Sequence, residues 1–261
     1  MSRTLGLCVG VAATILLLAE DLKAAAPNKL PPGFKLCPRN DPTTSSCLEE
    51  AISVALHELA SGLPEFGIPT LEPLEIPQLS IGDPNSNAPV NLKINFTDIR
   101  IYNISSAKST NVKLDVDAFL ISPHVEIDSI YAEAHYKMDG RILLIPAKGE
   151  GKVVFNLTNL HGDGAMTGEK IMKKNKEYLK VNDFSFELNH LDKLVLHFEN
   201  LFNGDKTLGP TINNLVNENW MEIWSQLRVP LQEICGYSFR EYARRLFDKV
   251  PLDDVFLVKA P

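Results

Sequence analysis

Apolar and polar residues alternate with a period of two along most of the chain between Val90 and Phe198. Leu92, Ile94 and Phe96 alternate with polar neighbours, and similar runs recur further along. Successive side chains of a strand point to opposite faces of a sheet, so these runs predict strands with one dry and one wet face. Because no helix-length segment separates the runs, the pattern favours an antiparallel meander over a doubly wound parallel sheet.

Three interruptions within this region carry turn or bulge signals. The alternation changes phase near Asp128-Ser129, which predicts a β-bulge. Asp139-Gly140 is a dipeptide typical of a two-residue hairpin turn. The segment Gly162-Asp163-Gly164 does not have the spacing of a dinucleotide-binding turn and is interpreted as a loop.

A shorter helix is predicted before the strands. Ser46 and Glu49 form a capping box, and the apolar residues that follow it lie on one helical face. Gly62 ends this pattern. Prolines then separate apolar residues from Pro64 to Pro77. This predicts an edge segment or a strap, because proline cannot donate to a central ladder.

A broad apolar stripe at helical spacing begins at Ile212 and includes Trp220, Ile223 and Trp224. Pro230 interrupts it, so we expect one kinked or broken helix rather than two unrelated ones. Such a stripe needs a large apolar partner, and the dry face of a curved sheet supplies one. We therefore predict an α+β fold in which a strongly curved antiparallel sheet wraps a long C-terminal helix. The space left between them would be an apolar tunnel or cavity.

The first 26 residues have the pattern of a secretory signal peptide. Arg3 precedes an apolar run from Leu5 to Ala19, and three alanines at 24–26 suit cleavage. A transmembrane anchor is the alternative, but the run is shorter than a span requires and two acidic residues close it. Residues 27–261 are then predicted to be a single, secreted, extracellular domain without stable membrane insertion.

Secretion affects how the remaining cysteines are interpreted. Cys37 and Cys47 bracket a short polar segment, and an oxidising compartment favours a disulfide between them. Zinc is a weaker alternative, since there is no CxxC motif and only His57 lies near. Cys235 is left as a buried thiol or as an intermolecular partner. Three sequons are glycosylation candidates, at Asn95, Asn103 and Asn156.

Charge and motifs exclude several function classes. Lysine and arginine total 26 against 33 acidic residues, a net charge of −7, which argues against nucleic-acid binding. The chain has no GxSxG motif, P-loop or HExxH motif, and its six histidines show no paired ligand spacing. We therefore predict no catalytic residues, no metal site and no cofactor.

Separated motifs carry a resemblance to a known family. They are Leu36-Cys37-Pro38-Arg39-Asn40-Asp41 with Cys47-Leu48, Gly62-Leu63-Pro64-Glu65-Phe66-Gly67-Ile68-Pro69, Gly140-Arg141-Ile142-Leu143-Leu144-Ile145-Pro146, and Phe198-Glu199-Asn200-Leu201-Phe202-Asn203-Gly204-Asp205. Together they resemble the takeout family, relatives of the insect haemolymph juvenile-hormone-binding proteins, over residues 36–250. The hormone carriers proper have a second disulfide, whereas this chain offers only Cys235, so it is more similar to the takeout branch.

The resemblance implies a long helix wrapped by a curved sheet around an apolar tunnel. It also implies non-covalent carriage of a small lipophilic molecule, such as a terpenoid hormone or a fatty acid, without catalysis. Two alternatives remain open: a secreted interaction module with a filled core, and a hydrolase with an unrecognised site. The residues expected to line the tunnel are Leu114, Val116, Leu120, Tyr136, Met138, Phe184, Phe186, Phe198, Trp220, Ile223 and Trp224.

Overall fold

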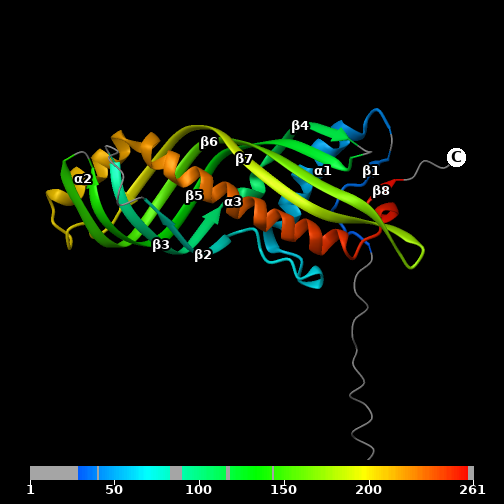
Figure 1. The fold of residues 1–261 in the computed structure, drawn as a ribbon, viewed down its shortest axis with the longest axis horizontal. Helices are drawn as coiled ribbons and strands as arrows, with labels where there is room; N and C mark the ends of the chain where they lie inside the picture. Colours follow the sequence, from blue (N-terminus) through cyan, green and yellow to red (C-terminus); the bar gives the residue numbers. More distant parts are fainter. Residues whose placement is uncertain (1–28, 40, 83–89, 116–117, 143, 258–261) are drawn as a thin grey trace, which may run out of the picture.

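A long, curved antiparallel sheet and a helix lying along it dominate the computed structural model, which describes residues 29–39, 41–82, 90–115, 118–142 and 144–257 (Figure 1). The predicted signal peptide lies outside the described residues. The sheet strands are β2 (Leu74–Ile81), β3 (Val90–Tyr102), β4 (Lys108–Asp115), β5 (Leu120–Ile142), β6 (Ile145–Lys173) and β7 (Lys176–Phe198). Their order is β2-β3-β5-β6-β7, and β4 also pairs with β5. All these pairings are antiparallel, as predicted from the alternation.

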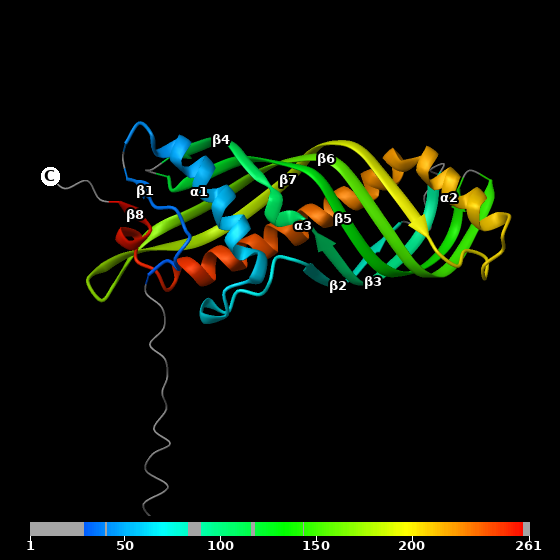
Figure 2. The same ribbon diagram turned by 180° about the vertical axis from the view of Figure 1, so that it is seen from behind.

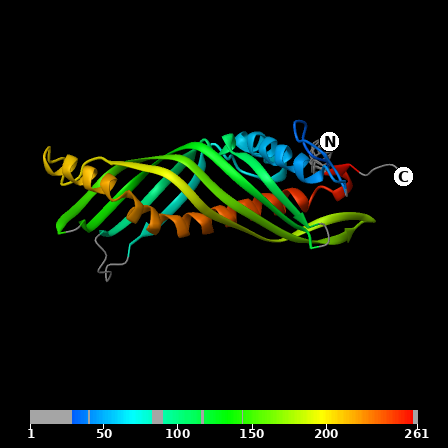
Figure 3. The ribbon, with the colours of Figure 1, turned by 90° about the horizontal axis from the view of Figure 1, so that it is seen from above.

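Helices occupy both ends and the concave side of the sheet. They are α1 (Thr44–Glu58), α2 (Leu208–Glu218) and α3 (Trp220–Phe247), with 3-10 turns η1 (Leu59–Ser61), η2 (Pro64–Phe66), η3 (Ile104–Ser106) and η4 (Leu252–Asp254). Figures 2 and 3 show α3 running along the sheet, with α2 at one end and α1 at the other. A parallel pair, β1 (Cys37–Pro38) and β8 (Phe256–Leu257), lies at the α1 end. The predicted fold class is confirmed.

The C-terminal helix breaks at a different place from the one predicted. Asn219 separates α2 from α3 with φ −107° and ψ 29°, whereas Pro230 lies inside α3. Leu227 and Leu231, on either side of this proline, both face the sheet side of the helix as lining residues of one interior cavity. Contact with the sheet on both sides of Pro230 offsets the missing backbone donor, so the helix continues.

Two turn assignments made from the sequence are wrong. Asp139 and Gly140 lie inside β5, and the connection to β6 comes after Ile142. Gly140 is required there because a Cβ would lie 2.2 Å from the Asn91 carbonyl oxygen on β3. The segment beginning at Gly162 is not a loop but part of β6.

The burial pattern does change phase near Asp128, but the β-bulge predicted there is wrong, because β5 and β6 keep one register through this point. Ile127 and Ile130 are both buried, with two outward-facing residues between them. Opposite them on β6, Asn159 has φ 53°. Because the irregularity occurs at facing positions of both strands, their pairing stays in register.

The first helix begins at Thr44, two residues before the predicted capping box. Asp41 performs the local hydrogen bonding, since its carboxylate accepts from the backbone N–H of Thr43 at 3.0 Å. Glu49 instead accepts from the Val112 N–H on β4 at 3.2 Å, which ties α1 to the sheet. The helix ends before Gly62, as expected.

The two outer strands of the sheet are protected in different ways. Pro77 lies in β2, where the predicted edge position tolerates a missing donor. Along the outer side of β7, side-chain amides take up the backbone hydrogen bonds that a further strand would make. The Asn213 amide accepts from the Phe198 N–H and donates to the Phe198 carbonyl, and Asn217 does the same for Leu196, at 2.8 to 2.9 Å. These amides anchor α2 to the sheet edge. Among the described residues, no helix has the length and hydropathy needed to cross a bilayer.

Candidate functional site

A cavity of about 350 Å³ lies inside the half of the molecule nearest α1. Its walls come from α1, from the inward faces of β2, β3, β5, β6 and β7, and from the part of α3 that begins at Trp224. The lining is almost wholly aliphatic and aromatic. An apolar cavity of this size is in the range of known small-molecule sites.

Small residues explain why this half is hollow. Alanines face the cavity from four elements or their connections: Ala51, Ala55, Ala107, Ala132 and Ala243. On β6, a Cβ at Gly162 would lie 2.7 Å from the Phe186 Cζ, so glycine lets that ring lie over the strand. Toward α2 the same face of the sheet carries large side chains, and the Tyr136 and Phe198 rings pack edge to face at 4.8 Å. The interior around these two rings is therefore closely packed.

The structure divides the predicted lining residues into groups. Phe184, Phe186 and Trp224 border the cavity. Leu114 borders a smaller pocket of about 40 Å³ near η4. The other described residues of the set do not border the cavity: Leu120, Tyr136, Met138, Phe198, Trp220 and Ile223. Val116 lies outside the described residues.

Position along the sheet accounts for most of these differences. Leu120 is an exception, because the next residue on β5, Ile121, borders the cavity and successive side chains point to opposite faces. Tyr136, Met138, Phe198 and Ile223 are all buried, as expected for the inward face. They lie at the filled end, where large side chains from β5, β7 and α3 meet. The Tyr136 hydroxyl donates to the Glu199 carbonyl at 2.6 Å, and burial raises its pKa to about 12. These residues form core, not cavity wall.

None of the lining residues predicted from the sequence belongs to α1, although α1 forms one wall of the cavity. Leu48, Ile52, Ala55 and Leu59 border the cavity, and their spacing does place them on one face of the first helix. Helical spacing shows an apolar face but not what that face covers. The signal that could have found them is the length of the sheet, which extends far from α2 and needs a cover at its other end.

Polar groups in the lining are few, and several already have partners. The Nε2 atom of the His161 ring, for example, is 2.8 Å from the Asn159 side-chain oxygen. The Lys35 ammonium is ion-paired with Glu50. The Tyr242 hydroxyl donates to the Thr70 carbonyl at 3.5 Å. Cys235 is a free thiol that borders the cavity, and desolvation raises its pKa to about 12. The wall therefore offers a guest mostly hydrocarbon contact.

The predicted disulfide is confirmed. Cys37 and Cys47 are bonded, with Cα atoms 5.7 Å apart. The three sequon asparagines lie on outward faces or turns: Asn103 and Asn156 are exposed, and Asn95 is half-buried beneath hydrogen bonds from Gln78 and Ser80. Their glycosylation remains a prediction.

Comparison with known proteins identifies a family model and several proteins that are similar to this chain. A family model described as "Haemolymph juvenile hormone binding protein (JHBP)" matches residues 10–257. "Circadian clock-controlled protein daywake" of Drosophila melanogaster is 22% identical over 241 residues, 87% of this chain and 88% of that protein. The protein of the same name from Drosophila yakuba is 21% identical over 226 residues, 81% and 83% of the two chains.

A solved structure has the same fold. "Crystal Structure of Epiphyas postvittana Takeout 1" superposes with a TM-score of 0.75 at 22% identity, covering 86% of this chain and 99% of that one. At this level of identity the likeness establishes a shared fold.

Proposed function

Because the chain belongs to the haemolymph juvenile hormone binding protein family, we propose that it is a secreted carrier of a small lipophilic molecule, held non-covalently in the cavity beside α1. The guest we propose is a terpenoid hormone, a fatty acid or a molecule of similar size and apolarity. The proposal involves no reaction and no cofactor. The observation that carries it is the hydrocarbon lining of the 350 Å³ cavity.

The energetics of transfer support this proposal. Removing apolar surface from water contributes about 25 cal/mol per Å². A guest that buries about 300 Å² would gain on the order of 7 kcal/mol, which corresponds to a dissociation constant in the micromolar range before association costs are subtracted. The preformed wall keeps those costs low, since few side chains need to be ordered on binding.

We place the polar end of the guest near Lys35. This lysine is a charged lining residue, and its side chain is 35% exposed, so the cavity wall reaches solvent there. A carboxylate or ester at that point could remain hydrated while the hydrocarbon part enters. Deeper in the cavity, Phe186 and Phe239 lie with ring centroids 6.4 Å apart and supply aromatic contact.

The binding test compares two aspartate substitutions on one strand. Phe186 borders the cavity, whereas Val195, also on β7, is 41% exposed on the outer face. Titration with cis-parinaric acid, a fluorescent fatty acid, should saturate at one molecule per chain for the unmodified protein and for Val195→Asp. Phe186→Asp should weaken binding by at least about tenfold, since its carboxylate would have to be buried beside hydrocarbon.

A second variant separates loss of binding from loss of folding. Ala132→Phe adds volume to the cavity without charge, and circular dichroism checks that the fold persists. Retained binding in both cavity variants, or no saturable binding by the unmodified protein, would overturn the carrier proposal. Mass spectrometry of protein recovered from culture medium would identify the bound lipid, and N-terminal sequencing would test cleavage after residue 26.

A further inference from the structure

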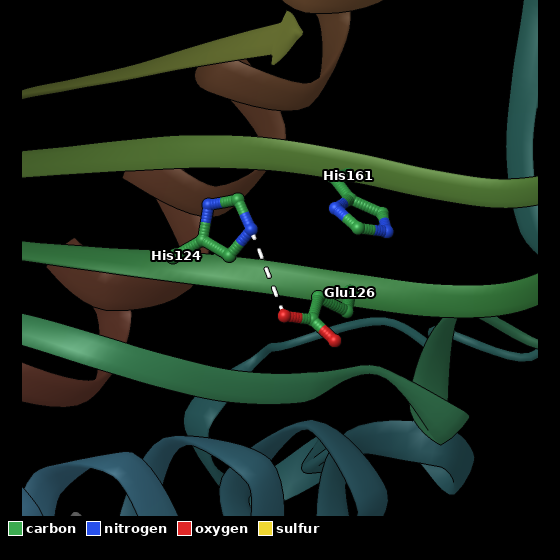
Figure 4. A group of neighbouring side chains, drawn as sticks. All are labelled: His124, Glu126 and His161. Carbon is green, nitrogen blue, oxygen red and sulfur yellow. Dashed lines mark ion pairs between the residues drawn. The ribbon is translucent and has the colours of Figure 1, made fainter. Parts of the chain in front are cut away.

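Three partly buried side chains on neighbouring strands of the sheet come together although the sequence does not pair them. His124 and Glu126 lie on β5 and His161 on β6, and one donor atom from each lies within 4.8 Å of the other two. Figure 4 shows them in front of the two strands, with α3 behind. Cross-strand register brings them together, because Glu126 pairs directly with His161.

Hydrogen bonds to the far side of each ring define which nitrogen is free. Nδ1 of His124 is 2.7 Å from the Asp163 carboxylate, so it carries the proton and leaves the Nε2 lone pair for a ligand. Nε2 of His161 is 2.8 Å from the Asn159 side-chain oxygen, so this nitrogen is the donor and Nδ1 is free. In Figure 4 the free nitrogen of His124 faces the Glu126 carboxylate.

This arrangement is that of metal-binding histidines. A ligand imidazole typically donates its other N–H to a carboxylate, an amide oxygen or a backbone carbonyl, which orients the ring and strengthens it as a ligand. Here both histidines have such a partner. Asn159 is itself held by Asp192, which accepts from its amide at 3.0 Å.

The distances suit a transition ion after small side-chain adjustments. Nε2 of His124 is 3.8 Å from the Glu126 carboxylate oxygen. Bonds of about 2.1 Å in a tetrahedral site require donor atoms roughly 3.4 Å apart, so shifts of about 1 Å would close the set. Lys108, which pairs with Glu126 across β4 and β5, has its ammonium 3.9 Å from Asp128. It therefore has a carboxylate partner other than Glu126.

From this geometry we infer that His124, Glu126 and His161 form a binding site for a divalent transition-metal ion of the zinc class, with water as the fourth ligand. Two imidazoles and one carboxylate are a ligand set that suits zinc, and calcium or magnesium would prefer oxygen alone. The bound ion would link β5 to β6 next to the cavity, which His161 borders together with Val125 and Leu160.

Zinc titration of the chelator-stripped, full mature protein tests the inference. Calorimetry with zinc chloride should give one ion per chain. His124→Gln and Glu126→Gln should each weaken binding by more than about tenfold, because each removes a ligand atom. His135→Gln is the matched control, since His135 is exposed on the outer face of β5 away from the cluster, and it should leave the affinity unchanged.

A variant of a residue that orients a ligand distinguishes a specific metal site from non-specific binding of zinc to the surface. Asp163→Asn keeps all three ligands but removes the carboxylate that orients His124, so affinity should fall by about 10- to 100-fold with the stoichiometry unchanged. The visible spectrum of the cobalt-substituted protein should report a low-coordinate site that disappears in His161→Gln. Absence of saturation at one ion, or equal binding by His124→Gln and His135→Gln, would overturn the inference.

Discussion

Replacement of Asn217 by alanine should loosen the junction between α2 and the sheet edge. The Asn217 side chain accepts from the Leu196 N–H and donates to the Leu196 carbonyl, both at 2.8 Å, and also donates to the Asn213 carbonyl. β7 is an outer strand, so no further strand can take over these bonds. The amide acts as a substitute for the missing neighbour.

The magnitude follows from the groups left unpaired. An unsatisfied buried backbone donor or acceptor costs about 1–3 kcal/mol, and Asn217→Ala orphans two such groups on Leu196. Because the bonds are only partly buried, the lower half of that range applies, which gives a loss of about 2–4 kcal/mol. Leu196 is itself 1% exposed, so its backbone cannot readily turn to solvent.

Asn214→Ala supplies the control, since Asn214 is exposed on the same helix. Alanine favours helix formation, and this variant measures that gain alone. Urea unfolding followed by circular dichroism should show a lower midpoint for Asn217→Ala and little change, within about 0.5 kcal/mol, for Asn214→Ala. Equal midpoints in the two variants would refute the role assigned to the amide.

Further expected outcomes concern the thiol, the disulfide and the start of α2. Cys235 in the native protein should react with iodoacetamide at least about tenfold more slowly than an ordinary thiol at pH 8, because burial raises its pKa to about 12 and so lowers the thiolate fraction; unfolding should abolish the protection. Replacing both Cys37 and Cys47 by serine should lower the free energy of unfolding by about 3 kcal/mol in urea titrations, as expected for loss of a cross-link with a sequence separation of 10. Backbone N–H groups of Leu208 and Thr207 lower the pKa of Asp205, so its stabilising effect, present above the ordinary value of 3.8, should be lost as the pH falls through the lower folded value. Asp205→Asn should flatten the dependence of the urea midpoint on pH over that window; an unchanged slope would contradict the assignment.

The local sequence pattern is sufficient to predict most strands and helices and which of their faces is buried. Strand alternation is a property of the backbone, so the period of two alone assigns Leu92, Ile94 and Phe96 to the dry face, and all three are buried. The C-terminal helix and the short disulfide loop depend on neighbours in sequence, and both are predicted correctly except for the position of the helix break, which is Asn219 and not Pro230. Turn positions are less accessible: Asp139-Gly140 has the composition of a turn, but packing between β3 and β6 extends β5 past it.

The sequence by itself determined that this chain builds an apolar interior between a curved sheet and a helix, because residue periodicity specifies which face each side chain occupies. Only the tertiary structure decided where that interior stays open. The alternation of apolar and polar residues does not reveal how far apart Tyr136 and Phe186 lie along the sheet. Nor does it reveal which side chains from α1 and α3 pack against these two residues. The same holds for His124 and His161, which are far apart in the chain and adjacent only through strand register.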